Sequence, residues 1–302
     1  MIPRLKGMYN CFLLSKFFKK LNIDIIHSFH YGSDYSEAIS AKIAGIPWVF
    51  TKKNMSWGGS SKNSWKLRSY LASQILVQNR DMFFFYKDKT VNLVPRGVSN
   101  VTFLKSNKIN LREVLEIGKN KKIIISVSNL VYVKGIHVLI DAFELICEND
   151  SSFHLIIVGD TRTLYGQEMK QKALKSDYSN KINFIGKVNN VKDYLSIADL
   201  FVLPTLDEGR KEGSPVALLE AMAIGLNVLA SKIAGIKDIL SNFPENMFTP
   251  GDKKNLFTAI LREFSDSQQN KGKLLSSHVR ENYSLMKEVT SHQEIYKKCI
   301  KT

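Results

Sequence analysis

The sequence predicts an α/β fold made of two domains, and three observations support this. Short apolar runs rich in Ile and Val alternate with longer segments of helical period, which is typical of βαβ units around parallel sheets. The chain has 302 residues, of which 44% are hydrophobic, enough for two cores of ordinary size. A polar segment at residues 105–110 separates two series of such units. We therefore expect one domain at residues 1–105 and a second at residues 106–285.

The apolar runs define the expected elements in chain order. Strands are expected at residues 24–28, 48–51, 74–78, 91–94, 123–127, 154–158, 182–185, 200–203 and 227–230. Helices are expected at residues 12–21, 35–44, 80–86, 135–147, 167–174, 191–196 and 215–224, and only helical patterns follow residue 252. The first series opens with a helix, whereas a Rossmann-like domain usually opens with a strand and a Gly-rich turn. We therefore expect a short or incomplete amino-terminal domain.

Composition restricts the class of partner and the compartment. The net charge of +15 indicates a negative partner, such as anionic lipid or a phosphorylated substrate. The basic residues are dispersed and accompany no zinc-finger or RNP pattern, which disfavours nucleic acid. The three cysteines Cys11, Cys147 and Cys299 lie far apart in the sequence and are odd in number. This pattern favours reduced thiols in a cytoplasmic protein over a set of disulfides. Neither a long apolar span nor a signal peptide is evident, so we expect a protein of the cytosol.

The segment before the helix expected at residues 215–224 has the features of an anion site. Ser214 suits the N-cap and Pro215 the first helical position. The free backbone N–H groups of Val216 and Ala217, with the positive end of the helix dipole, would then face a ligand at the end of a strand. Gly213 would let a phosphate approach because it has no side chain.

Two carboxylates accompany this helix start. Glu212 precedes the helix and Glu220 lies inside it. One could contact the sugar of a nucleotide sugar while the other accepts hydrogen bonds from the ribose diol. An acidic loop followed by a solvated helical glutamate is an equally good interpretation of the residues alone.

Residues 212–223, EGSPVALLEAMA, resemble the signature of the retaining glycosyltransferases of the glycosyl transferases group 1 or family 4 type. The resemblance implies two Rossmann-like domains in the GT-B arrangement, with Glu212 at the donor sugar and Glu220 at the ribose. It also implies a helix at residues 286–302 that crosses back to the first domain. Glu208 precedes a glycine too, but its spacing to Glu220 does not fit the signature.

Residues 126–135 are similar to the family's phosphate-binding strand and turn. Lys134 and Gly135 match the Lys-Gly pair, whereas Asn129 stands where the family has an arginine. The substitution removes a cation worth roughly 1 to 4 kcal/mol at 4 Å, so Lys134 and the helix starts must hold the diphosphate, with Arg210 or Lys211 as a further source of charge. A lysine in a surface turn is the alternative for Lys134.

Weaker matches extend the resemblance along the chain. Gly186 corresponds to a glycine near the nucleotide base, although a glycine at a strand end is often only a turn. His27 and His30 are the candidates for a neutral imidazole that contacts the transferred sugar or the acceptor, and His30 is the preferred one. A histidine packed at the end of a strand is an equally good interpretation. The loop at residues 52–59 could receive an anionic or lipid-linked acceptor, or be a simple loop.

The helix expected at residues 12–21 is amphipathic and basic. Its apolar face contains Leu13, Leu14, Phe17, Phe18 and Leu21, and three lysines lie elsewhere. Such a helix could rest on anionic lipid at the inner face of the membrane. Packing against the sheet is the alternative.

The resemblance to this family implies a retaining, metal-independent hexosyltransferase. It would move a sugar from a UDP- or GDP-sugar to a glycan or lipid-linked acceptor in bacterial surface polysaccharide synthesis. The nucleotide sugar is a co-substrate, and we expect no cofactor and no metal. Two alternatives stay open: a truncated, inactive relative that binds nucleotide sugar, and a nucleotide-sugar epimerase.

Overall fold

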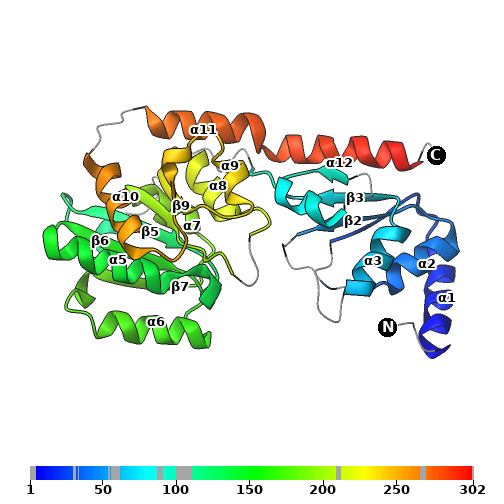
Figure 1. Cartoon of the computed structure of the whole chain (residues 1–302), viewed down its shortest axis with the longest axis horizontal. Coiled ribbons are helices and arrows are strands. Elements are labelled where there is room, and N and C mark those ends of the chain that lie inside the picture. Colours follow the sequence, from blue (N-terminus) through cyan, green and yellow to red (C-terminus); the bar gives the residue numbers. More distant parts are fainter. Residues whose placement is uncertain are drawn as a thin grey trace. The chain divides into compact units, whose positions relative to one another are not determined.

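The computed structural model of the chain describes residues 5–29, 32, 34–53, 55, 62–86, 91–99, 111–208, 212–265 and 270–300. These form two compact units (Figure 1). Unit 1 is Met1–Arg96 together with Met286–Thr302, and unit 2 is Gly97–Leu285. Each unit has a parallel sheet covered by helices, so the predicted α/β class with two Rossmann-like units is confirmed.

Unit 1 is built on a sheet of four parallel strands in the order β1-β2-β3-β4. The strands are β1 (Ile26–Ser28), β2 (Trp48–Lys52), β3 (Gln74–Val77) and β4 (Val91–Leu93). The helices are α1 (Leu5–Lys20), α2 (Ser36–Ala44), α3 (Lys62–Leu71), the 3₁₀ helix η2 (Arg80–Tyr86) and α12 (Leu285–Ile300). The carboxyl-terminal helix α12 packs into this unit because Ile295 and Cys299 form a buried cluster with residues of β2 and β3.

Unit 2 has a six-stranded parallel sheet in the order β10-β9-β8-β5-β6-β7. Its strands are β5 (Lys122–Val127), β6 (Phe153–Val158), β7 (Ile182–Gly186), β8 (Leu200–Leu203), β9 (Asn227–Ser231) and β10 (Met247–Phe248). The chain runs outward from β5 to β7, returns to β8 beside β5, and continues to β10. This reversal creates a topological switch point between β5 and β8, the place where open α/β sheets bind ligands.

Helices cover both faces of the second sheet (Figure 1). They are α4 (Leu111–Val114), α5 (Ile136–Asn149), α6 (Leu164–Leu174), α7 (Val191–Ile197), α8 (Val216–Ala223), α9 (Ile236–Ile239), α10 (Lys253–Ser265) and α11 (Lys271–Asn282), with the 3₁₀ turns η4 (Tyr132–Lys134), η5 (Ser179–Lys181) and η6 (Pro244–Asn246). Along β5, Ile124 enters the core beneath α5 while Ile123 and Ile125 enter the core beneath α8. Alternating strand side chains thus fill two buried layers, which explains why this strand reads as a continuous apolar run.

Several elements differ from the sequence-based expectation. The segment at residues 80–86 is a 3₁₀ helix and not an α-helix, and α3 and β10 were not predicted. Helix α3 combines polar residues with a buried tryptophan, Trp65, so its apolar period is weak. Strand β10 has only two residues, too few for a periodic pattern. The boundary segment at residues 105–110 lies outside the described residues.

The apolar face predicted for the first helix is only partly covered in the structure. Leu14 and Phe18 are half-buried, but Leu13, Phe17 and Leu21 are exposed. The reason is tertiary: α1 packs along α2, and the side of α1 that becomes covered carries the buried Cys11.

Candidate donor site

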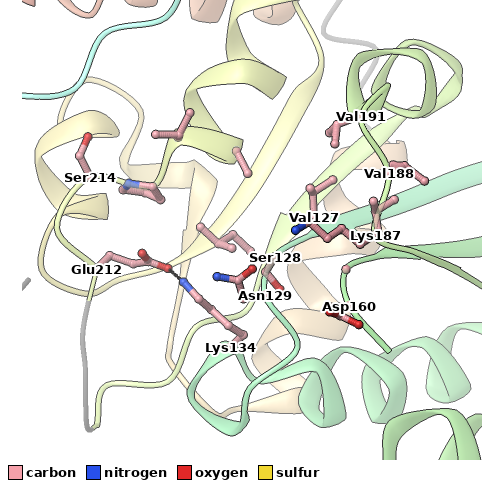
Figure 2. Close-up of a pocket in the computed structure, with 16 residues that line it drawn as sticks. Val127, Ser128, Asn129, Lys134, Asp160, Lys187, Val188, Val191, Glu212 and Ser214 are labelled. Atoms are coloured by element: carbon pink, nitrogen blue, oxygen red, sulfur yellow. Dashed lines mark hydrogen bonds and ion pairs between the residues drawn. The ribbon is translucent and has the colours of Figure 1, made fainter. Parts of the chain in front are cut away.

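A pocket of about 380 Å³ lies in unit 2 at the carboxyl ends of β5, β6 and β8, where the sheet order reverses (Figure 2). The switch point therefore holds the cavity that this topology predicts. Its lining residues come from the ends of β5, β6 and β8, from four loops, from the 3₁₀ turn η4 and from helices α7 and α8: Val127, Ser128, Asn129, Lys134, Val158, Gly159, Asp160, Lys187, Val188, Val191, Leu203, Glu212, Ser214, Pro215, Val216 and Ala217.

Lys134 reaches the pocket from a tightly constrained turn. It ends the 3₁₀ helix η4, and Gly135 follows in the left-handed region at φ 65° before α5 begins. A Cβ atom at Gly135 would lie 2.0 Å from the carbonyl oxygen of Pro204. Only glycine fits both the backbone conformation and this close approach. The role of Gly135 in the structure is thus to hold the Lys134 turn against the end of β8.

The ammonium group of Lys134 and the carboxylate of Glu212 form an ion pair in the pocket (Figure 2). The same Glu212 oxygen, Oε1, accepts a hydrogen bond of 3.1 Å from the hydroxyl of Thr205, which is fully buried. The side chains of Lys134 and Glu212 are 19% and 11% exposed. The cation and the carboxylate are therefore held at one point on the pocket wall.

The start of α8 forms another wall of the pocket, but its cap differs from the prediction. The helix begins at Val216, Pro215 occupies the N-cap position, and no side chain caps the helix. Ser214 is therefore not the N-cap; its hydroxyl is buried and has no hydrogen-bond partner among the described residues. The backbone N–H groups of the first turn of α8 have no carbonyl partner within the helix, because the helix begins at Val216. Binding of an anion by these groups stays a prediction.

The position of the expected arginine is occupied by Asn129, which lies on the pocket wall. Arg210 and Lys211, the other cations considered for the phosphate, lie outside the described residues. The structure places a different cation at the pocket, Lys187, which follows β7. In the sequence, only its position directly after Gly186 indicated that Lys187 could lie near the pocket. Asp160, which follows β6, also lines the pocket. Arg162 donates two hydrogen bonds to its carboxylate, which hold the pKa of that carboxyl well below the ordinary range.

Four of the predicted residues do not line the pocket surface: Gly135, Gly186, Gly213 and Glu220. Gly186 ends β7 at φ 83°, in agreement with the turn interpretation. Gly213 is buried beside the pocket residues Glu212 and Ser214. Glu220 lies one turn into α8, and burial raises the pKa of its carboxyl.

We expect Glu220→Ala to weaken binding of the nucleoside diphosphate by about 1.5 to 3 kcal/mol, if its carboxylate accepts hydrogen bonds from the ribose diol. Isothermal titration calorimetry with UDP and GDP measures the loss. Burial raises the pKa of Glu220, so its carboxylate is protonated earlier than an ordinary glutamate as the pH is lowered. The affinity of the unsubstituted chain for the nucleoside diphosphate should therefore begin to fall at a higher pH than it would with an ordinary glutamate at this position. The exposed Glu168 of α6 gives a matched control, Glu168→Ala. Unchanged affinity in Glu220→Ala would remove this residue from the ribose site.

The histidines considered for catalysis belong to unit 1. His30 lies outside the described residues, as do residues 54 and 56–59 of the loop that follows β2. His27 lies on β1, where its imidazole nitrogens share hydrogen bonds with the hydroxyl of Tyr296 and, at 2.8 Å, with that of Thr51. Burial and the nearby His292 lower the pKa of His27 to about 4, so its ring is neutral at pH 7.

Within the described ranges, no group of three or more His, Cys, Asp or Glu side chains is placed to hold a metal ion. The described helices also include none that is long and apolar enough to cross a membrane.

The family model and the similar proteins all indicate one family. Residues 107–276 match the model of the family described as "Glycosyl transferases group 1". The chain is 26% identical to the Escherichia coli UDP-Gal:alpha-D-GlcNAc-diphosphoundecaprenol alpha-1,3-galactosyltransferase, with 98% of this chain and 80% of that protein covered. Other curated relatives share shorter stretches, such as the Erwinia amylovora amylovoran biosynthesis glycosyltransferase AmsK, at 33% identity over 46% of this chain and 35% of that protein.

Solved structures agree with the fold. A glycosyltransferase from Rickettsia africae ESF-5 has a TM-score of 0.87 at 19% identity, covering 100% of this chain and 84% of that one. Anabaena Alr3699/HepE, solved in complex with UDP and glucose, has a TM-score of 0.80 at 20% identity, covering 95% and 80%. The chain thus belongs to the glycosyl transferases group 1 family, and its two Rossmann-like units have the GT-B fold.

Proposed function

We propose that the chain transfers a hexosyl unit from a UDP- or GDP-sugar to a glycan or lipid-linked acceptor, with retention at the anomeric carbon and without a metal ion or other cofactor. The observation that carries this proposal is the pairing of Lys134 with Glu212 at the start of α8, inside the switch-point pocket. The site combines a cation, free helix N–H groups and a carboxylate within one cavity. These are the groups that a diphosphate joined to a sugar requires.

The chemistry follows from the charges of the site. When the glycosidic bond to the diphosphate breaks, negative charge grows on the leaving phosphate oxygen. The Lys134 ammonium and the N–H groups at Val216 and Ala217 would stabilise that charge, because they are fixed in place before the reaction begins. Glu212 would orient the sugar hydroxyls. The departing phosphate would take the proton of the acceptor hydroxyl, so no protein base is assigned.

Two relatives support the class of substrate. The name of the Escherichia coli relative states a UDP-galactose donor and a diphosphoundecaprenol-linked acceptor, and the Anabaena structure contains UDP and glucose. By analogy, the present chain would act in the synthesis of a bacterial surface polysaccharide.

A panel of mass-labelled UDP- and GDP-sugars, each incubated with the chain and lipid-linked acceptors, tests the proposal. We expect one donor to be consumed with label in a glycosylated product, an unchanged anomeric configuration by NMR, and equal turnover in EDTA. An inverted product contradicts retention, and a loss of turnover in EDTA contradicts the metal-free reaction. Donor binding without turnover favours the inactive relative, and a sugar altered while still attached to the nucleotide favours the epimerase.

We further propose that the chain lies in the cytoplasm and binds to the inner surface of the membrane through helix α1. Its solvent-facing side exposes five large apolar residues and carries three exposed lysines: Met8, Tyr9, Phe12, Leu13, Phe17, Lys16, Lys19 and Lys20. Apolar rings interleaved with cations favour the interface of an anionic bilayer. Vesicle flotation should show stronger binding to phosphatidylglycerol than to phosphatidylcholine, and Lys16→Glu with Lys20→Glu should abolish the difference. Equal binding to both lipids would contradict this placement.

A further inference from the structure

The pocket of unit 2 has two chemically different ends. It crosses the ends of strands that lie in the order β8-β5-β6-β7. The ion pair of Lys134 and Glu212 follows β5 and β8, whereas Asp160 follows β6 and Lys187 follows β7 (Figure 2). Two strand spacings, roughly 10 Å, separate β5 from β7. This distance leaves room for the ribose of a nucleotide between phosphates at the ion pair and a base near β7.

Three valines make the end of the pocket near β7 apolar, and we call this part the β7 end. Val127, Val188 and Val191 line it, and each packs against the buried core beneath α8. Their side chains are thus held in place and offer a fixed apolar surface to a flat ring. The polar side chains of Asp160 and Lys187 lie at the same end. They can therefore distinguish one base from another by the atoms on its edge.

The carboxylate of Asp160 has little capacity left for a ligand. Its Oδ1 accepts hydrogen bonds from the backbone N–H of Arg162 at 3.0 Å and from Nε of Arg162 at 2.9 Å. Its Oδ2 accepts a third, from Nη2 of Arg162 at 2.7 Å. A carboxylate has about four acceptor positions, so one position, on Oδ2, stays open. Asp160 can therefore accept one hydrogen bond from a base, but not two parallel ones.

Lys187 adds a donor and a positive charge to the β7 end. Hydrogen bonds from Arg162 lower the pKa of Asp160 most, and the charge of Lys187 lowers it further, so the ammonium group of Lys187 lies near this carboxylate. An ammonium group only donates hydrogen bonds. With Arg162 included, the three charged side chains have a formal sum of +1. Such a site favours carbonyl oxygens of a base and disfavours its amino groups.

Uracil fits these groups better than cytosine or guanine does. Its edge has one N–H donor between two carbonyl oxygens, which matches one open acceptor beside a cation. Cytosine has an amino group in place of the O4 carbonyl, and this group would face the ammonium of Lys187. Guanine has two adjacent donors, N1–H and the N2 amino group, which suit a carboxylate with both oxygens open. At Asp160 one of them would be buried without a partner, which is costly.

We propose that the β7 end of the pocket selects uracil, with Lys187 donating to a uracil carbonyl and the Arg162-bound carboxylate of Asp160 accepting from the uracil N3–H. The inference rests on the proposed function, because it takes a nucleotide sugar as the ligand of this pocket. It narrows the donors from UDP- and GDP-sugars to UDP-sugars, and it assigns the choice to the contact between Asp160 and Arg162.

Calorimetric titration of the full chain with UDP, CDP and GDP, at fixed ionic strength, tests the proposal. The three nucleotides share the ribose and the diphosphate, so ratios of their affinities report the base alone. We expect UDP to bind about tenfold or more tightly than GDP, and about fivefold or more tightly than CDP.

The variant Arg162→Ala releases the carboxylate of Asp160. It should raise the affinity for GDP relative to UDP about fivefold or more, because both carboxylate oxygens become open to guanine. A merely structural role of Arg162 would weaken both nucleotides alike. The Arg162 side chain is 81% exposed, so its removal leaves the core intact. The matched control is Arg280→Ala, at an exposed arginine of α11, which should leave the ratio unchanged.

The variant Lys187→Met removes the charge and the donor while keeping a long side chain. The preference for UDP over CDP should fall to about twofold or less, because nothing then opposes the amino group of cytosine. Any weaker attraction of the diphosphate affects both nucleotides equally and does not change their ratio. Lys254→Met, at an exposed lysine of α10, is the matched control and should keep the full preference.

Equal affinities for the three nucleotides, or a preference for GDP, would overturn the proposal. An unchanged UDP-to-GDP ratio in Arg162→Ala or an unchanged UDP-to-CDP ratio in Lys187→Met would overturn it as well. If the chain transfers sugar but shows no base preference, the proposed function stands and this inference alone fails. If UDP is preferred as described but no donor is turned over, the uracil site stands and the proposed transferase fails.

Discussion

Lys134→Ala should reduce binding of the nucleoside diphosphate by about 10- to 100-fold, or about 1.5 to 3 kcal/mol. Two effects add. The substitution removes the ammonium group from a site where Asn129 already replaces the expected arginine, and it leaves the carboxylate of Glu212 without the cation that the structure pairs with it. The remaining carboxylate would then repel the phosphates. Calorimetry with UDP and GDP at fixed ionic strength measures the loss, because salt screens such charges.

The specificity of this loss separates it from damage to the fold. The uncharged nucleoside should bind the variant about as well as it binds the original chain, since it has no phosphate to meet Lys134. Lys254→Ala, at an exposed lysine of α10, should leave both affinities unchanged. Asn129→Arg should tighten diphosphate binding, because it restores a cation at the pocket wall. If Lys134→Ala keeps the full preference for diphosphate over nucleoside, the phosphates bind elsewhere, and Lys187 becomes the first residue to test.

Glu212→Gln should lower turnover by about 100-fold while nucleoside diphosphate affinity stays the same or increases. The fall in turnover follows if Glu212 acts on the sugar as bonds change, where losses of preorganised electrostatic groups cost about 10² in rate. The increase in affinity follows from the ion pair: the amide no longer neutralises Lys134, so the ammonium is free to bind phosphate. The amide oxygen can still accept the hydrogen bond from Thr205, so we expect little loss of stability.

Steady-state kinetics and calorimetry together measure these opposite effects. Equal decreases in kcat and kcat/KM would assign the loss to the transition state. Glu245→Gln, at an exposed glutamate of η6, is the matched control, and thermal denaturation checks that each variant is folded. Normal turnover in a folded Glu212→Gln chain would remove this residue from the reaction.

The amino-acid sequence by itself determined the fold class and most of the elements. In unit 2 the apolar runs are long enough to show their period, and the observed strands β5 to β9 begin and end within one residue of the predicted bounds. Five of the predicted donor residues surround one pocket together with Glu212 and Lys134: Asn129, Ser214, Pro215, Val216 and Ala217. The sequence could indicate this because the site is formed by strand ends and one helix start, which are set by local patterns.

Only the tertiary structure decided how these groups meet. Lys134 and Glu212 are 78 positions apart, and nothing in either segment shows that they pair, because the contact depends on the order of β5 and β8 in the sheet. Lys187 enters the pocket for the same reason. The exposed side of α1 depends on its packing against α2, and the surroundings of His27 depend on α12, whose Tyr296 lies 269 positions away. Such contacts depend on how elements that are distant in the sequence pack together. The local periodicity of the sequence does not contain this information.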